Sequence, residues 1–473
     1  MTILFQVIST GIASYICMSI GVMFAWPSST LQLFSSVNTT LNRPMTETEG
    51  ALLGSLSSFS ALISIPFVSY FVETLGRKYC CMLFTVIQII SWVIITVCYN
   101  VEAILAASFL FGICRCIMLV VPIYISEICQ ASIRGAMTSS AMIFQSIGML
   151  VSYLMGGYLS YDALNYACLT MTVLGVVLMS FLKESPIHLM RKGHEKEAKR
   201  AIAFYRGTSI NSNLVEEELK TLRRALNPDL GDATPEEEKL NSDLQENPKL
   251  SWWQFLKKSR STRRALFMIV VIDTASLFQG RMVLQVYAEP LFAEAVPSIS
   301  PTICSVIFTI VTIMSSFIGA FLVERAGRRL LMIYASFATG VCCVLLGTQI
   351  QLHWGPHWVT VMFMFIYGVT FACGAGTVPC VLFAEIFLPE IKSVAVMIEV
   401  EWFMVCSFIV LFIYNPLVTA IGLGPVFYFF AVACFFSVIF CFFFLPETKG
   451  LNVDVIQTLF IKRNIRRRYM IDT

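Results

Sequence analysis

Acidic and basic side chains recur at matched spacings in two distant parts of the chain. Each part has a carboxylate, then a Gly followed by two bases, and later a carboxylate seven residues before another base. The members are Glu73, Arg77, Lys78, Glu127 and Arg134 in the first part and Glu324, Arg328, Arg329, Glu385 and Lys392 in the second. Oppositely charged groups of these types form charge-assisted hydrogen bonds. The spacing therefore predicts ion pairs that can close and separate.

Four more charged residues lie inside otherwise apolar segments: Asp273, Arg281, Glu399 and Glu401. Asp273 and Arg281 are eight residues apart, about 12 Å along one helix, which is too far for a direct pair. Arg281 can reach Glu401 instead. That pair either locks two helices together or takes part in binding a charged cargo, because ionisable groups in a membrane span are functional by default.

The composition indicates what surrounds these charges. Apolar residues make up 57% of the 473 residues, charged residues 13%, and the mean hydropathy is +0.75. A soluble chain carries roughly 25% charged residues. Disorder, a coiled coil and a nucleic-acid-binding domain are excluded, and a net charge of +3 is too small to imply a polyanionic partner. The chain is therefore an integral membrane protein.

Neither a metal site nor a catalytic site is expected. The sixteen Cys lie mostly in apolar runs and are interpreted as small reduced core residues. Nucleophile-elbow, HExxH, P-loop and dinucleotide-binding motifs are missing from the sequence. The four histidines, His188, His194, His353 and His357, are expected at the surface, in or beside loops. We predict no enzyme activity and no cofactor.

Twelve apolar runs are long enough to cross a bilayer as helices, which needs about 20 residues each. They lie near 5–32, 51–72, 80–99, 102–127, 136–159, 163–182, 265–289, 301–323, 330–350, 358–386, 393–419 and 423–445. The first run has no Lys or Arg before it and no small-residue cleavage site after it, so we expect a retained span and not a signal peptide.

Basic residues set the expected orientation. The short loops on one side carry Arg77, Lys78, Arg134, Arg325, Arg328, Arg329 and Lys392, whereas the loops on the other side carry only Arg43. Lys and Arg favour the cytoplasmic side, so both termini are expected there. Asn38-Thr39-Thr40 in the first outer loop is a sequon, which predicts glycosylation of Asn38.

The segment 183–264 divides the spans six and six. Its charged residues and helical apolar spacing predict short amphipathic helices at 195–205 and 214–226 in a cytoplasmic linker, and a flexible stretch at 227–248. The linker is either a solvated connection or part of a gate. The expected domains are a bundle at 1–182, the linker at 183–264, a second bundle at 265–445 and a basic tail at 446–473.

The two bundles share a repeat. Glu184-Ser185-Pro186 closes the first and Pro446-Glu447-Thr448 closes the second, in the same order as the charged sets. Two related six-helix halves are typical of transporters, with the cargo site between them. The charged sets then form a gate on the inner face. The simpler alternative is that they only follow the bias of positive charge toward the cytoplasm.

Longer motifs accompany this repeat. They are Arg115, Pro122-Ile123-Tyr124-Ile125-Ser126-Glu127, Arg134-Gly135, Gly374-Ala375-Gly376-Thr377-Val378-Pro379 and Pro446-Glu447-Thr448-Lys449-Gly450. With them the chain resembles the sugar porter branch of the major facilitator superfamily along nearly its whole length. The stretch from Gly21 to Ser28 is similar to insect members, including facilitated trehalose transporters. The resemblance implies alternating access for a hexose or small oligosaccharide, and it adds Arg115 to the gate.

The sugar-binding positions of that family are mostly changed. Its amides fall on Met142, Ser276, Leu277, Met282 and Thr312, and of its last Asn-Trp pair only Trp402 is kept. Replacement candidates for binding sugar hydroxyls are Gln145, Ser276, Gln279, Gln285, Tyr287 and Thr312, together with Trp402. The alternative for each is a hydrogen bond between helices without cargo.

The sequence thus predicts an all-α membrane protein of twelve helices in two pseudo-symmetric bundles that carries a neutral sugar down its gradient at the plasma membrane. Facilitated diffusion is favoured because the first span has no acidic residue. A nutrient sensor on the same fold and a carrier of an organic anion or other small solute remain open. Expected partners are the bilayer and the solute; a monomer is compatible with the sequence.

Overall fold

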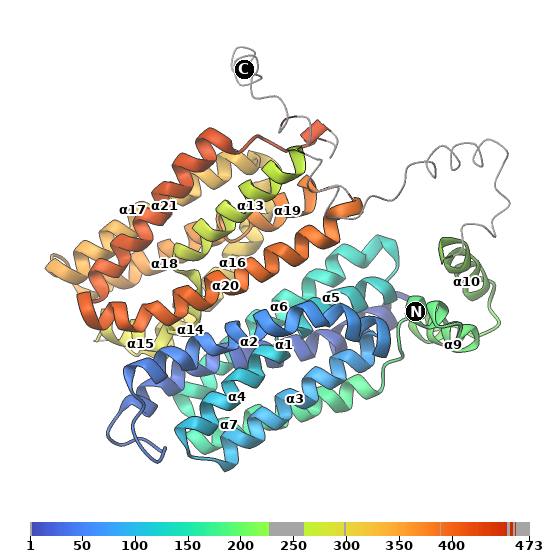
Figure 1. The fold of residues 1–473 in the computed structure, drawn as a ribbon, viewed down its shortest axis with the longest axis horizontal. Helices are drawn as coiled ribbons and strands as arrows, with labels where there is room; N and C mark the ends of the chain where they lie inside the picture. The colour runs from blue at the N-terminus through green and yellow to red at the C-terminus, as the bar shows by residue number, and fades with distance from the viewer. Residues whose placement is uncertain are drawn as a thin grey trace. The chain divides into compact units, whose positions relative to one another are not determined.

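The computed structural model describes residues 2–226, 260–297, 299–387, 389–451, 455–456 and 459. Within these ranges the regular structure is helical, without a strand (Figure 1). The all-α prediction is confirmed. The stretch 227–248 and the basic residues of the tail, from Lys462 to Arg468, lie outside the described residues.

Contacts divide the chain into two compact units. The first holds residues 1–26, 40–43 and 59–249, and the second holds 27–39, 44–58 and 250–473. The outer parts of the first two long helices therefore pack with the second unit, although they precede the first unit's remaining helices in the sequence. No sequence pattern indicated that parts of these two helices would pack with the second unit.

The first unit is built on seven helices: α1 Thr2–Ser35, α2 Glu47–Leu75, α3 Arg77–Val97, α4 Val101–Cys114, α5 Ile117–Ile128, α6 Ala131–Tyr158 and α7 Tyr161–Ser180. Helix α3 packs against α4, α5 and α7. The rings of Trp26, Trp92 and Phe111 meet in its core, with Trp92 and Phe111 5.0 Å apart. Helices α1 and α6 touch at backbone distance, because a Cβ on Gly21 would lie 1.9 Å from the carbonyl oxygen of Gln145.

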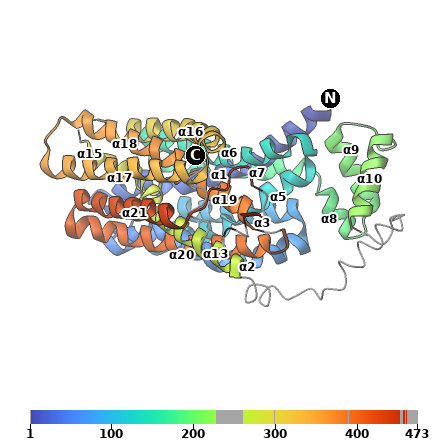
Figure 2. The same cartoon turned by 90° about the horizontal axis from the view of Figure 1, so that it is seen from above.

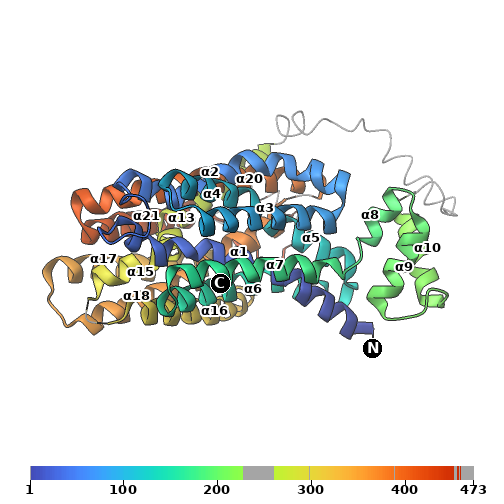
Figure 3. The same ribbon diagram turned by 90° about the horizontal axis from the view of Figure 1, so that it is seen from below.

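Three short helices follow: α8 Pro186–Arg191, α9 Glu195–Arg206 and α10 Asn213–Leu226. The last two confirm the amphipathic helices expected in the linker. Helices α9 and α10 lie side by side (Figures 2 and 3) and bury Ile202, Ala203 and Val215 between them. Arg206 on α9 pairs with Glu218 on α10 at 2.5 Å, and Arg206 is only 7% exposed, so an ion pair with a buried arginine accompanies the apolar contact.

The second unit is built on nine helices: α13 Arg260–Phe278, α14 Arg281–Val286, α15 Ala288–Ala295, α16 Pro301–Ala326, α17 Arg328–Leu352, α18 His357–Cys373, α19 Val378–Ile386, α20 Pro389–Ile421 and α21 Leu423–Phe444. Helices α17 and α21 make the most extensive contact of the chain's described helices. Glycine permits it, because a Cβ on Gly347 would lie 2.6 Å from the ring of Tyr428.

Parts of α1 and α2 complete the second unit. The hydroxyl of Ser28 accepts a hydrogen bond of 2.8 Å from the backbone N–H of Glu289. A Cβ on Gly54 would lie 2.1 Å from the phenol oxygen of Tyr287. Tyr287 is fully buried and stacks on Tyr414 at 5.1 Å. The absence of a side chain at Gly54 is therefore what allows α2 to pack over Tyr287.

Eleven helices in the described ranges are long and apolar enough to cross a membrane. They correspond to eleven of the twelve expected spans. The remaining one, expected at 265–289, is divided into α13, α14 and α15. The break falls at Gln279–Gly280, where Gly280 has a φ of 99°, a conformation that favours glycine.

The cysteines are free thiols, and fourteen of the sixteen are buried. Cys98 is half-buried and Cys380 is exposed. Their interpretation as reduced core residues is confirmed.

Candidate functional site

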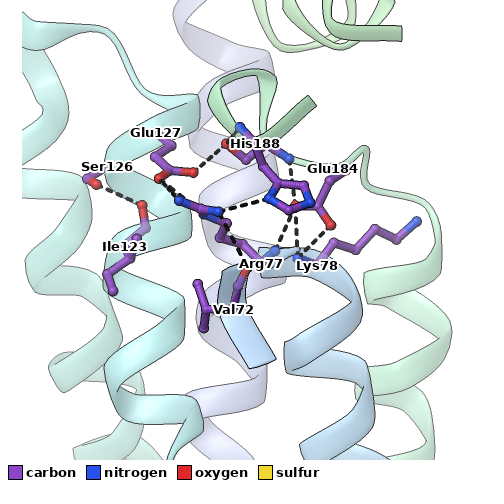
Figure 4. A network of polar contacts seen from close by, with 9 residues as sticks. Val72, Arg77, Lys78, Ile123, Ser126, Glu127, Glu184 and His188 are labelled. Atoms are coloured by element: carbon purple, nitrogen blue, oxygen red, sulfur yellow. Dashed lines mark hydrogen bonds and ion pairs between the residues drawn. The ribbon is translucent and has the colours of Figure 1, made fainter. Parts of the chain in front are cut away.

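Arg77 is the centre of a buried polar network at the end of the first unit where α2, α5 and α8 meet (Figure 4). Its guanidinium donates to Glu127 Oε1 from Nη2 at 2.8 Å and from Nε at 3.1 Å. It also donates to the carbonyl of Val72 at 3.4 Å. Arg77 is 5% exposed, so removing one partner would leave a buried charge without its counter-ion.

Glu184 binds the start of α3. Its carboxylate accepts from the backbone N–H of Arg77 at 2.9 Å and of Lys78 at 3.1 Å. A negative group at a helix N-terminus is favoured by the free N–H groups and the helix dipole. Gly76 precedes this start with a φ of 96°, and a Cβ there would lie 2.5 Å from Glu184 Oε2. The Gly and the carboxylate therefore fix this helix end together.

Lys78 and Ser185 extend the same network. Lys78 Nζ donates to the carbonyls of Ser180 at 2.9 Å and Leu182 at 2.7 Å, at the end of α7. The hydroxyl of Ser185 donates to Glu127, on the carboxylate oxygen that Arg77 does not use. The network thus connects α3, α5, α7 and α8.

His188 lies inside this network, so its assignment to the surface was wrong. It is 6% exposed, and its Nδ1 lies 3.0 Å from Nη1 of Arg77. Because the guanidinium can only donate, Nδ1 accepts and the ring is neutral. Burial lowers the pKa of His188 below its ordinary value of 6.5, and the charge of Arg77 adds to this effect. His194, His353 and His357 are exposed, as expected.

Arg328 organises the equivalent network in the second unit. Its guanidinium donates to Glu385 at 2.5 Å and 3.2 Å, to Glu324 at 3.1 Å and to the carbonyl of Val323 at 3.1 Å. Glu447 accepts from the N–H of Arg328 at 2.9 Å and of Arg329 at 3.1 Å. The side chain of Arg329 donates to the carbonyl of Phe442 at 2.8 Å.

The remaining expected gate residues are Glu73, Arg115, Arg134 and Lys392. Glu73 and Arg134 are exposed and form no ion pair with any residue in the described ranges. Arg115 lies at the turn between α4 and α5, with its guanidinium 5.1 Å from the ring centre of Phe24. The side chain of Lys392 lies outside the described residues. The seven-residue spacing from Glu127 to Arg134 thus corresponds to no ion pair in the described structure.

Five residues of the networks were missing from the predicted gate: Glu184, Ser185, His188, Glu447 and Thr448. Thr448 donates to Glu385 at 2.9 Å, as Ser185 does to Glu127. A signal for four of them was present, because they belong to the two motifs that close the halves. His188 had no such signal, since the second half has no matching histidine.

Two polar side chains beside the break in the seventh span lack partners. The amide of Gln279 is fully buried, and neither its oxygen nor its nitrogen is hydrogen-bonded in the described structure. The hydroxyl of Ser276 is 6% exposed and also without a partner there. Buried polar groups are normally paired, and each unpaired one costs about 1–3 kcal/mol. These two are therefore the strongest candidates for cargo contact.

The other expected cargo residues have partners. Tyr287 donates to the carbonyl of Leu411 at 3.2 Å, Thr312 to that of Thr309 at 2.9 Å, and the indole of Trp402 to Thr274 Oγ1 at 2.7 Å. Gln285 is half-buried and has an interaction of its own. Gln145 is half-buried on α6 of the first unit. Tyr287 and Trp402 each have one side-chain donor, and each uses it for a hydrogen bond to another helix. Trp402 nevertheless stays 42% exposed.

The intramembrane charges do not pair as expected. Arg281 has no ion pair or hydrogen bond in the described part of the chain, and Oε1 of Glu401 is without a partner there. The carboxyl groups of Asp273 and Glu399 interact with each other instead. The expected pair between Arg281 and Glu401 is absent from the structure, because the guanidinium lies against Phe371 instead, 5.9 Å from its ring centre.

Asn38 lies exposed in a turn after α1. That position is accessible to modification, but glycosylation itself remains a prediction.

Comparison with known families identifies the class of protein. The model of the family described as "Sugar (and other) transporter" matches residues 9–460. The chain belongs to this family, and it is a multi-pass membrane transporter and not an enzyme.

Several relatives are named facilitated trehalose transporter Tret1. The chain is 26% identical to the one from Polypedilum vanderplanki, over 97% of this chain and 90% of the relative, and 27% identical to the one from Bombyx mori, over 89% and 81%. It is also 26% identical to the one from Drosophila yakuba, over 98% of this chain. The chain spans about half of that relative's length, 52%.

Solved structures share the fold. The inward-open xylose transporter XylE from E. coli is similar with a TM-score of 0.75 and 18% identity, over 95% of this chain and 98% of that one. A partially occluded form of the same transporter gives a TM-score of 0.73 and 17% identity, over 94% and 100%. The major facilitator fold expected from the sequence is confirmed.

Proposed function

We propose that the chain is a facilitative transporter of a hexose or trehalose that works by alternating access. The observation that carries this proposal is the break at Gln279–Gly280, with the buried, unpartnered Gln279 and Ser276 beside it. Discontinuous helices with free polar groups are typical of transporter binding sites. The names of the relatives support sugar, and trehalose in particular, as cargo.

The gate proposed for the inner face consists of Arg77, Lys78, Glu127, Arg328, Arg329 and Glu385, together with Glu184, Ser185, Glu447 and Thr448. Each ion pair lies within one unit. Such pairs make the helix ends of one bundle rigid, so that each bundle moves as a body. The proposed role is therefore to keep each bundle rigid, which differs from the expectation that the pairs themselves close and separate.

Residues Gln279 and Ser276 are the proposed hydrogen-bonding groups for sugar hydroxyls. Thr312 can still accept a hydrogen bond, since a hydroxyl that donates keeps its lone pairs. The exposed ring of Trp402 offers an apolar face, and sugar rings pack on such faces by burial of their C–H groups.

The protein is proposed to lie in the plasma membrane with both termini in the cytoplasm and with Asn38 outside. The excess of basic residues in loops on one side supports this orientation.

Facilitated diffusion is the proposed mode. Helix α1 contains no acidic residue. One of the structurally similar proteins is a proton:xylose symporter, so proton coupling is the alternative to be tested. Uptake that is unchanged by a proton uncoupler supports facilitated diffusion, and strong inhibition contradicts it.

Radiolabelled glucose and trehalose uptake into oocytes tests the function. We expect saturable uptake of at least one sugar above that of water-injected cells, with equal surface expression as the control for comparisons between variants. Stabilisation of the purified protein by a sugar, without uptake, would instead identify a sensor on the same fold.

A further inference from the structure

Within the described part of the chain, Arg281 in the seventh span is a positive charge without a counter-ion. It begins α14 directly after the Gly280 turn, and its side chain is exposed. No ion pair or hydrogen bond joins it to another residue in the ranges that the structure describes. An unpaired charge within a span costs several kcal/mol, and such residues are rare unless a partner or a ligand compensates them.

The neighbours of Arg281 do not neutralise it. The Phe371 ring, 5.9 Å from the guanidinium carbon, gives a cation–π contact at the long end of its range. The groups that act on it electrostatically are the thiol of Cys380 and the phenol of Tyr367, and neither is a carboxylate. Tyr367 uses its hydroxyl to donate to the carbonyl of Gln279 at 2.7 Å.

The intramembrane carboxyl groups of the second unit do not pair with Arg281. Asp273 interacts with Glu399, and no guanidinium in the described ranges lies within 4.0 Å of Glu401. The planar guanidinium of Arg281 therefore keeps its five donors free, and this fork matches a carboxylate or a phosphate.

Uncharged groups for hydroxyls lie on the same segment as this free cation. Gln279 is two residues from Arg281, and Ser276 is three residues before Gln279, about one helical turn. Resting on the proposed transport function, we propose that the cargo is a sugar bearing an anionic group, which pairs with Arg281 while Gln279 and Ser276 bind its hydroxyls. A sugar acid is the class that this combination fits, and a sugar phosphate shares the chemistry.

The test compares four solutes on the full chain in oocytes. D-glucuronate carries hydroxyls and a carboxylate, glucose 6-phosphate carries hydroxyls and a phosphate, glucose carries hydroxyls alone, and acetate carries charge alone. We expect glucuronate or glucose 6-phosphate to inhibit uptake of the radiolabelled sugar at concentrations at least about 10-fold lower than those at which glucose inhibits it. The reason is that hydrogen bonds to charged groups are stronger than those between neutral groups. The better of these two identifies the anionic group.

Arg281→Gln should reduce uptake of the anionic sugar by about 10- to 100-fold relative to uptake of glucose. Arg281→Lys should restore most of the loss, because it keeps the charge. Arg325→Gln is the matched control: Arg325 also stacks on an aromatic ring, Phe321 at 4.7 Å, but at a helix end with exposed surroundings. It should change neither uptake.

If Arg281→Gln reaches the surface and the ratio of anionic to neutral uptake is unchanged, the inference is overturned. Poor folding of that variant leaves the Arg281→Lys comparison and the four-solute ranking as tests. Uptake of glucose or trehalose without competition by either anion overturns the inference alone. If no solute is taken up but glucuronate stabilises the purified protein against heat, and this stabilisation depends on Arg281, the transport proposal is overturned and the anion site is kept.

Discussion

The polar networks around Arg77 and Arg328, here called the two rim networks, have the same construction in both units. Arg77 and Arg328 each donate to a glutamate, Glu127 and Glu385, at 2.8 Å and 2.5 Å. Each Arg has its backbone N–H bound at 2.9 Å by a second carboxylate, Glu184 or Glu447. The hydroxyls of Ser185 and Thr448 each donate a hydrogen bond to Glu127 and Glu385, respectively.

The difference between them is the third neighbour of the guanidinium. His188 takes this place in the first unit and Glu324 in the second. His188 is a neutral acceptor that becomes a cation in acid, whereas Glu324 is an exposed carboxylate. Duplication thus preserved the carboxylates on both sides of the Arg, whereas the third neighbour of the guanidinium differs between the networks.

Removing the guanidinium is the largest expected perturbation. Arg77→Ala should destabilise the protein by about 3–5 kcal/mol, because the largely buried Glu127 would lose its counter-ion. Arg328→Ala should cost less, since the side chain of Glu385 is 27% exposed against 11% for Glu127. The midpoint of thermal unfolding in detergent measures both. Arg200→Ala, at an exposed position of α9, is the control that should change little.

A larger loss for Arg328→Ala than for Arg77→Ala would contradict the argument from burial. An equal loss would mean that Glu324 stabilises Arg328 as much as the deeper site stabilises Arg77.

Adding a methyl group at the turn should affect both units alike. Gly76 and Gly327 have φ values of 96° and 86°, and a Cβ would lie 2.5 Å from Glu184 and 2.6 Å from Glu447. Gly76→Ala and Gly327→Ala are each expected to cost about 1–3 kcal/mol, because the backbone conformation is nearly restricted to glycine. Thermal unfolding of the single variants measures this. Gly135→Ala, with open space around it and a helical position in α6, serves as the comparison and should be neutral or stabilising.

The smallest expected effect is that of acid, which should weaken the network around Arg77 and not the one around Arg328 through His188. The pKa of His188 is lowered in the folded protein, so the unfolded chain binds its proton more readily. Its stabilising contribution is complete above pH about 6.5 and is lost as the pH falls below that value. We expect His188→Gln to show a smaller loss of thermal stability between pH 7.5 and 5.5 than the unmutated protein. An identical loss in both proteins would exclude His188 as the acid-sensitive group.

Local pattern predicted much of this construction. Charge-free runs of about 20 residues specified the spans, because a bilayer accepts only helices with their backbone groups paired. The repeated Gly and Arg predicted both networks. The prediction failed at Arg134, which the spacing treated like Arg77 although it is exposed.

The sequence by itself determined membrane residence, the duplicated halves and which residue types meet at each rim, since these follow from hydropathy and from repeated motifs. Only the tertiary structure decided which charges found partners. Glu127 and Glu385 are 50 and 57 residues from their arginines, and the distance between such groups depends on how whole helices pack. The same packing put His188 against Arg77, broke the seventh span at Gly280 and left Arg281 without an ion pair to any described carboxylate.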